Sequence, residues 1–101
     1  MNIVSRTQSN ESTIQLSGRF DFNTHRDFRA AYEELLAAGG ITKITLDMQW
    51  VEYLDSSALG MLLLLNEKAG PSHVKIVISK PQPNVRQILE IANFNKLFTI
   101  S

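Results

Sequence analysis

The sequence predicts an α/β fold with a small mixed β-sheet that carries its helices mainly on one face. Segments with alternating apolar residues take turns with segments of helical periodicity, in the order ββαβαβαβ, which favours parallel central strands. The strands alternate apolar with polar residues instead of forming continuous apolar runs, so one face of the sheet is expected to meet solvent. A length of 101 residues with 44% hydrophobic residues suits one small domain over residues 1–101.

The first two strands are expected in "NIVSRTQ" and "STIQLSG", on either side of the polar turn around "SNE". Ile14 and Leu16 alternate with polar neighbours in the second strand, and Gly18 is expected to end it. Such a pair can form an antiparallel hairpin, and the sheet would then be mixed.

The first helix follows in "FDFNTHRDFRAAYEELLAAGG", where five apolar residues recur on one helical face: Phe28, Ala31, Tyr32, Leu35 and Leu36. Asn23 or Thr24 can cap its start, and Asp27 suits its first turn. Gly39 and Gly40 are expected to end it.

The remaining elements follow from the same two periodicities. Strands are expected at 41–48 and 73–79, and the last segment, 96–100, can close the sheet. Helices are expected at 56–70 and 82–93, the latter with Pro83 in its first turn. The four leucines Leu62 to Leu65 cover every side of a helix, so all four are expected in the core.

Charge and composition exclude several classes of function. Ten basic and ten acidic residues balance, so nothing draws the whole chain to nucleic acid. Cysteine is absent and the two histidines, His25 and His73, lack ligand spacing, so no metal or other cofactor is expected. The N-terminus does not resemble a signal peptide, and the longest apolar run is far below the roughly 20 residues of a membrane span. We therefore expect a cytoplasmic protein without membrane insertion.

The stretch "YLDSSALGMLLLLN" places Asp55, Ser56 and Ser57 between a predicted strand and the most apolar helix. Ligands tend to bind at such carboxyl ends of parallel strands. One interpretation is helix capping, which needs a single short polar side chain and contributes about 1 kcal/mol. If Ser57 is the cap, Ser56 is left exposed at the tip of the loop. The other interpretation is regulation, because a phosphate on Ser56 would add roughly −1.5 to −2 charges that a helix N-terminus tolerates.

At this point the sequence resembles the STAS domains, in particular the bacterial anti-sigma factor antagonists. The stretch "LDMQWVEYLDSSALGMLLLL" is similar to their signature of an apolar lead, Asp-Ser-Ser/Thr, a small residue, a branched residue and glycine. "LSGRFDFNT" and "NVRQILEIANFNKLF" resemble two further family segments, so the resemblance extends from about Ile3 to Ile100. One departure is Ala58, where the best-known members carry glycine; its methyl group is expected beside the phosphate acceptor, where it could alter the choice of kinase.

The resemblance implies a partner-switching regulator of transcription that is not an enzyme. The unmodified protein would bind an anti-sigma factor that is also a serine kinase, or another anti-sigma protein, and so free the sigma factor. Phosphorylation of Ser56 would release that partner, and a PPM-type serine phosphatase would restore binding. Asp55 corresponds to the acid beside the acceptor, Ser57 to the capping neighbour, and Asp21 to the acid of the other loop.

The residues around these two loops suit a contact surface, because aromatic residues and arginine are enriched at interface centres. We expect Trp50 to be exposed or partly exposed. The expected partner-binding residues are Asp21, Phe22, Asn23, Trp50, Asp55, Ser56 and Ser57.

Two alternatives remain open at this stage. A STAS subunit could belong permanently to a larger assembly, such as a lipid-transport ABC complex, with Ser56 as a cap and contact only. A serine hydrolase is a weaker alternative, because the G-x-S-x-G motif is absent and no histidine has the spacing of a catalytic base. Glycine-rich phosphate loops are also absent.

Overall fold

The computed structural model describes all 101 residues as a five-stranded mixed sheet with three α-helices. The strands lie in the order β1-β2-β3-β4-β5, with β1 antiparallel to β2 and all other neighbours parallel. The strands are β1 (Asn2–Gln8), β2 (Glu11–Phe20), β3 (Lys43–Leu54), β4 (Lys75–Ser79) and β5 (Thr99–Ile100). The helices are α1 (His25–Ala38), α2 (Ser56–Ala69) and α3 (Pro83–Ile91), with short 3₁₀ helices η1 (Phe22–Thr24), η2 (Gly70–Ser72) and η3 (Phe94–Lys96). This order confirms the predicted fold class.

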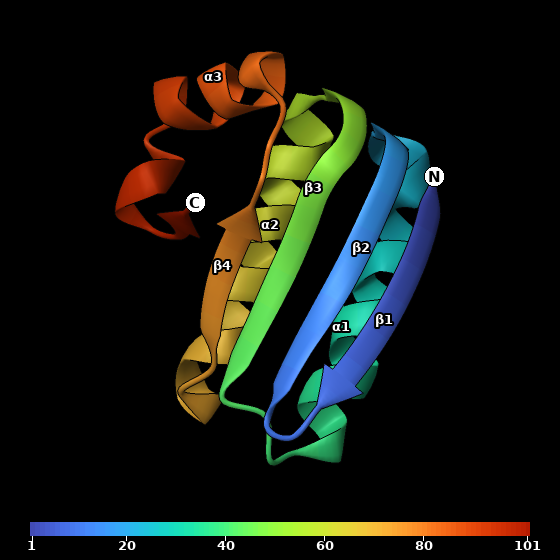
Figure 1. Ribbon diagram of the computed structural model, residues 1–101, viewed down its shortest axis with the longest axis vertical. Helices are drawn as coiled ribbons and strands as arrows, with labels where there is room; N and C mark the ends of the chain where they lie inside the picture. Colours follow the sequence, from blue (N-terminus) through green and yellow to red (C-terminus); the bar gives the residue numbers. More distant parts are fainter.

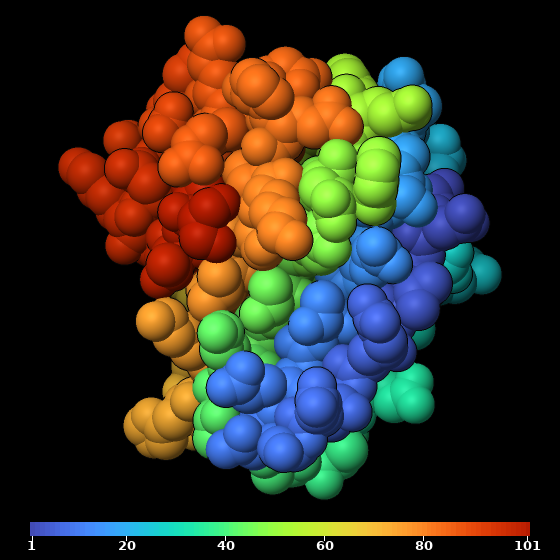
Figure 2. Space-filling view, in the orientation of Figure 1, coloured from blue at the N-terminus to red at the C-terminus, as the bar shows by residue number.

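The sheet and two of the helices form two layers. α1 lies behind β1 and β2, α2 lies behind β3 and β4, and α3 sits beyond the end of β4 (Figure 1). The opposite face of the sheet carries no helix and meets solvent (Figure 2). The expectation that the helices lie mainly on one face is therefore confirmed. None of the helices is long and apolar enough to cross a lipid bilayer.

The core fills the space between the sheet and the two helices. The strand residues that face α1 and α2 are Ile14, Leu16, Ile44, Leu46, Met48, Ile76 and Ile78, and all are buried. The helices contribute Phe28, Tyr32 and Leu35 from α1 and Met61, Leu62 and Leu65 from α2. This is the period-2 and period-3.6 pattern that the sequence predicts.

A carboxylate bridge joins the two helices on the solvent side of this core. The Oε2 atom of Glu33 in α1 lies 3.1 Å from Arg29 Nε and 3.6 Å from Lys68 Nζ of α2. The hydrogen bond from Arg29 is the main cause that lowers the pKa of Glu33 below its ordinary value. Beneath the bridge, burial raises the pKa of Tyr32.

Two strand ends differ from the prediction. Gly18 does not end β2, which continues to Phe20, and β3 does not stop at residue 48 but runs to Leu54. Parallel pairing between the two strands extends to Phe20 opposite Leu54 and holds both extensions. Gly18 has φ +103°, a conformation that favours glycine, at a shift in the β2–β3 register. The glycine therefore bends the strand instead of breaking it.

Candidate functional site

The two predicted loops meet at the carboxyl ends of β2 and β3. Phe20 and Leu54 are opposite each other at the last paired position, so Asp21 and Asp55 leave the sheet side by side. The backbone N–H of Asp55 donates to the carbonyl of Phe20 at 3.3 Å and ties the two exits together. The tertiary structure thus brings together two acids that lie 34 positions apart in the sequence.

Asp55, and not Ser57, caps α2, and this corrects the expectation for Ser57. The Asp55 carboxylate accepts from the N–H of Ala58 at 2.9 Å, and the Asp55 carbonyl accepts from the N–H of Leu59 at 3.2 Å. The reason is the position of the turn: Asp55 has extended backbone angles and the helix already begins at Ser56. The cap residue is the last extended residue, and its side chain reaches the third helical N–H.

Ser56 is the first residue of α2 and is exposed to solvent. It lies in the first helical turn instead of at the tip of a loop, which is a second correction. The Ser56 hydroxyl makes no hydrogen bond to any other group of the chain. The neighbouring Ser57 is less accessible, because it is half-buried. The acceptor predicted from the sequence is thus accessible, and it stands where the helix N-terminus favours negative charge.

Asp21 organises the second exit. Its carboxylate accepts from the N–H of Asn23 at 3.0 Å, and its own N–H donates to the hydroxyl oxygen of Thr24 at 3.3 Å, so the two residues form a capping box at the start of η1. Neither Asn23 nor Thr24 caps α1 through its side chain; the buried Thr24 hydroxyl bonds to the carbonyl of Arg19 instead. This tight turn leaves the Phe22 side chain 71% exposed. The aromatic ring is therefore free for a partner.

Trp50 is 56% exposed because β3 contains two extra residues relative to β2. The register passes from Gln15↔Asp47 to Ser17↔Trp50, and from Gly18↔Val51 to Arg19↔Tyr53. Each bulge reverses the alternation of side chains. The buried positions consequently run Met48, Val51 and Leu54, and both Trp50 and Tyr53 face solvent. The expected exposure of Trp50 is confirmed, although it lies within a strand and not in a loop.

The bulged part of β3 extends beyond its pairing with β4, and α3 holds it. The side-chain amide of Gln82 donates to the carbonyl of Gln49 at 2.9 Å, and that of Asn84 donates to the carbonyl of Glu52 at 3.3 Å. The carboxylate of Asp47 accepts from both the backbone N–H and the side-chain amide of Gln49 at 3.1 Å. These bonds satisfy backbone groups that the bulges remove from the ladder.

Arg19 and Tyr53 complete this end of the sheet. The Arg19 guanidinium lies 4.3 Å from the centre of the Tyr53 ring, and its Nε lies 3.8 Å from the Asp21 carboxylate. A cation over an aromatic face and near a carboxylate is attracted to both. Tyr53 was not among the expected contact residues. The sequence signal that could have identified Tyr53 is the break in the alternation of apolar and polar residues after Met48. The two bulges of β3 explain this break.

The leucine run is only half in the core. Leu62 and Leu65 are fully buried, but Leu63 is 41% and Leu64 42% exposed, which contradicts the expectation for all four. The solvent side of α2 also carries Ser56, Gly60 and Glu67, which recur at helical spacing. The sheet and α1 cover α2, but not on the side that carries Leu63 and Leu64, so these two leucines remain as an apolar surface on the same helix as Ser56.

Ala58 is fully buried, so its methyl group points into the core. The expected position of this methyl group, on the surface beside Ser56, is therefore wrong. Its influence on kinase choice stays a prediction. The Cα–Cβ direction at the third helical residue faces the sheet, as the buried neighbours Met61 and Leu62 on the same side indicate.

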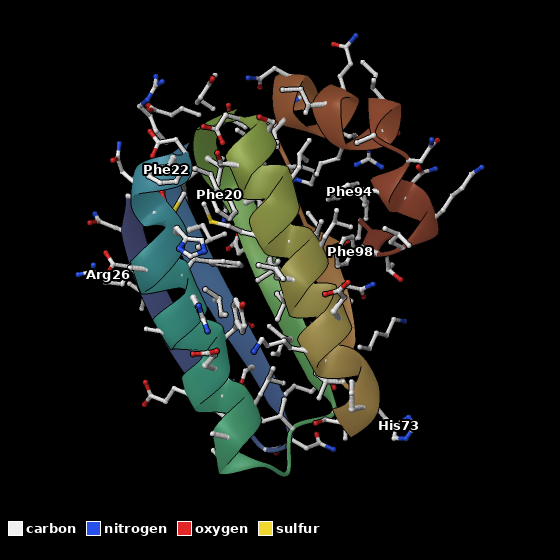
Figure 3. All side chains as sticks on the ribbon, turned by 180° about the vertical axis from the view of Figure 1, so that it is seen from behind. Phe20, Phe22, Arg26, His73, Phe94 and Phe98 are labelled. Carbon is white, nitrogen blue, oxygen red and sulfur yellow. The ribbon has the colours of Figure 1, made fainter.

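The two histidines, His25 and His73, are both exposed. His73 lies at the end of the molecule away from Phe20 and Phe22, next to the far end of α2 (Figure 3). No three histidine, aspartate or glutamate side chains come together in a way that could ligate a metal ion. The two strand exits next to Ser56 carry the Asp21 and Asp55 carboxylates, and the exposed rings of Phe22 and Trp50 belong to the same two strand-end segments, which suits recognition by another protein.

Comparison with known proteins agrees with this geometry. A STAS-domain containing protein of Pseudomonas aeruginosa (strain UCBPP-PA14) is 50% identical over 91 residues, covering 90% of this chain and 88% of the relative. The anti-sigma F factor antagonist of Paenibacillus polymyxa is 26% identical over 91 residues, covering 86% of this chain and 74% of the relative.

Solved structures share the fold at low identity. The anti-sigma factor antagonist SpoIIAA superposes with a TM-score of 0.85 in its unphosphorylated form, at 18% identity over 99% of this chain and 88% of SpoIIAA. The phosphorylated form of SpoIIAA from Bacillus superposes with a TM-score of 0.77, at 17% identity, and the match covers 99% of this chain and 91% of SpoIIAA. The STAS domain of a SulP transporter from Vibrio cholerae superposes with a TM-score of 0.75, at 19% identity, and the match covers 95% of this chain and 77% of that domain's chain. The family model described as "Mlab, STAS domain" matches residues 3–99, and the chain therefore belongs to the STAS domain family.

Proposed function

We propose that this protein is an anti-sigma factor antagonist that works by partner switching. Without phosphate it binds an anti-sigma factor that also acts as a serine kinase, and phosphorylation of Ser56 releases that partner. The observation that carries the proposal is the exposed, unbonded hydroxyl of Ser56 in the first turn of α2, directly after the capping carboxylate of Asp55. The similarity to a relative named as an anti-sigma F factor antagonist supports the same function.

The geometry explains how a phosphate could change binding without unfolding the chain. Asp55 already occupies the N–H of Ala58, so the fold does not need the Ser56 hydroxyl. A phosphate adds roughly −1.5 to −2 charges at a helix N-terminus, where free N–H groups and the helix dipole favour anions. The unphosphorylated and phosphorylated structures of SpoIIAA both share this fold, which is consistent with such tolerance.

The partner's surface would not tolerate that charge. Juxtaposing like charges at an interface costs several kcal/mol. A cost of about 3 kcal/mol weakens binding on the order of a hundredfold, which is enough to dissociate a complex. The contact surface of the proposal includes Phe22, Asn23 and Trp50, with Asp21 and Asp55 shaping the two exits.

Two measurements test the switch. Incubation with ATP and the serine kinase partner, followed by mass spectrometry, should place phosphate on Ser56. Affinity capture from a lysate of the source organism should recover the anti-sigma factor with Ser56→Ala and lose it with Ser56→Asp. Ser72→Asp is the matched control, because Ser72 is exposed in η2 at the other end of α2. Equal capture by both Ser56 variants, or phosphate found solely elsewhere, would defeat the mechanism. A PPM-type phosphatase is the expected enzyme for the reverse step.

A permanent STAS subunit of a larger assembly is the second candidate. The fold similarity to the STAS domain of a SulP transporter favours it, because that domain is part of a membrane transporter. In this case Ser56 would serve as a contact without phosphate turnover. Stable co-purification with a membrane complex such as a lipid-transport ABC complex, unaffected by Ser56→Ala or Ser56→Asp, would identify this function.

A further inference from the structure

β1 is an open edge of the sheet. It has seven residues and pairs with β2 alone, so the backbone groups on its outer side have no partner within the chain. Of the common ways of protecting an edge, it contains no proline and no bulge, and Arg6 is its single charged residue. The other edge, β5, has only two residues. β1 is therefore the place where this sheet can accept another strand.

A groove runs between this edge and α1. It has a volume of about 340 Å³, and α1 lies directly behind β1 in the fold (Figure 1). Ile3 and Ser5 line it from β1, while Ala30 and Ala31 line it from α1. The small alanine side chains leave room between helix and strand, and the half-buried Ile3 provides an apolar floor. An edge strand beside a helix can receive an extended peptide by strand addition.

The rim of the groove is acidic. Asp27 and Glu34 line it from α1, and neither takes part in an ion pair or a side-chain hydrogen bond within the chain. Met1, with its N-terminal ammonium group, and Asn2 also line the groove, and no lysine or arginine side chain does. Seven helical residues separate the two carboxylates by roughly 10 Å along the axis. Two residues four apart in an extended segment lie on the same face of a strand and are separated by roughly 13 Å, so their side chains can reach both carboxylates.

The opposite face of β1 also exposes an apolar side chain. Val4 points to the open side of the sheet and is 51% exposed. Because side chains of a strand alternate, one added strand would place residues on both faces of the sheet. Residues on one face would contact Ile3 and the two alanines, and residues on the other would cover Val4.

We propose that β1 and α1 form a docking groove for an extended segment of a partner protein that alternates apolar with polar residues and carries lysine or arginine at both ends. The segment adds to the sheet beside β1, and its basic side chains pair with Asp27 and Glu34. The groove lies on the β1 edge, whereas Ser56 follows β3 at the centre of the sheet. Asp27 borders both this groove and the depression beside Phe22 and Asn23, whereas Ser5 and Glu34 line the groove only. The proposal goes beyond the switch described above, and the Ser56→Asp variant tests whether docking is independent of it.

The experiment starts from a phage-displayed library of random peptides that is panned against the immobilised full chain. A synthetic copy of the most enriched peptide then serves as the probe for titration, with the chain labelled for NMR. Enriched sequences should alternate apolar residues and carry basic ends, and amide shifts should change in β1 and along α1 from Asp27 to Glu34. The double variant Asp27→Asn/Glu34→Gln should weaken binding by about tenfold, because two exposed ion pairs are lost.

Two matched variants complete the test. Glu67→Gln removes an exposed, unpaired carboxylate of α2 and should leave binding unchanged. Ser56→Asp should also bind the probe as the wild type does, even if the proposed switch fails. Ser5→Lys should abolish binding, because the new cation competes for the same carboxylates. No enrichment, shifts elsewhere on the chain, or equal binding by the double variant would overturn the proposal. A dimer in sedimentation velocity that Ser5→Lys dissolves would assign the edge to a second copy, which also overturns it.

Discussion

Replacing Asp55 by alanine should destabilise the protein without opening a cavity in its core. The carboxylate accepts one hydrogen bond, from the N–H of Ala58 at 2.9 Å, and Asp55 is half-buried at the start of α2. Removing such an N-cap costs about 1 kcal/mol, within a range of roughly 0.5–2 kcal/mol. The half-buried position and the carboxylate's favourable interaction with the helix dipole put the expected loss in the upper half of this range.

Two further variants separate capping from other effects. Asp55→Asn keeps a side-chain oxygen at the cap and should recover all but a few tenths of a kcal/mol. Ser57→Ala removes a hydroxyl that makes no cap hydrogen bond, so its free energy of unfolding should stay within about 0.5 kcal/mol of the wild type.

Urea denaturation followed by circular dichroism measures all three differences. For a domain of this size, 1 kcal/mol corresponds to a shift of roughly 4–8 °C in Tm, which thermal melts resolve easily. If Ser57→Ala lost as much stability as Asp55→Ala, or if Asp55→Asn were no better than Asp55→Ala, the assignment of the cap would be refuted.

The remaining predictions concern packing, binding and pH. Leu62→Ala should lose about 2–5 kcal/mol of unfolding free energy, and Leu63→Ala under about 0.5 kcal/mol, in urea denaturation; equal losses would contradict the burial pattern. If the protein binds an anti-sigma factor as proposed, Trp50→Ala should weaken that binding by roughly thirtyfold in calorimetry while the melting curve changes little. Because Arg29 lowers the pKa of Glu33, the stability advantage of the wild type over Glu33→Gln should be present at neutral pH and disappear as pH falls below the ordinary value of 4.5; an advantage that persists in acid would exclude the charge as its source.

The helices and strands could be predicted because each of them repeats one local pattern. Ile44, Leu46 and Met48 alternate along β3, and Phe28, Tyr32 and Leu35 recur along α1. Periodicity failed where the backbone departs from regular geometry. The sequence alone does not reveal the two bulges of β3, because they depend on pairing with β2 and on hydrogen bonds from Gln82 and Asn84 of α3.

The candidate site shows the same division. Asp55 and Ser56 were identified from adjacent residues and their resemblance to a family signature, and both lie at the predicted strand-to-helix junction. The cap was assigned to the wrong residue, since a one-residue difference in where the helix starts decides which side chain reaches the third N–H. Burial of Leu63 and Leu64 was overestimated because the sequence does not show that only one side of α2 is covered.

By itself, the sequence determined the order of the elements, the apolar face of each and the serine at the head of α2. These features depend on neighbours within one or two turns of the chain, where the backbone period fixes which side chains share a face. Only the tertiary structure decided that Asp21 and Asp55 stand together, that Tyr53 faces outward, and that β1 remains an open edge. Each of these depends on the register between strands far apart in the sequence, and register is set by the packing of the whole sheet.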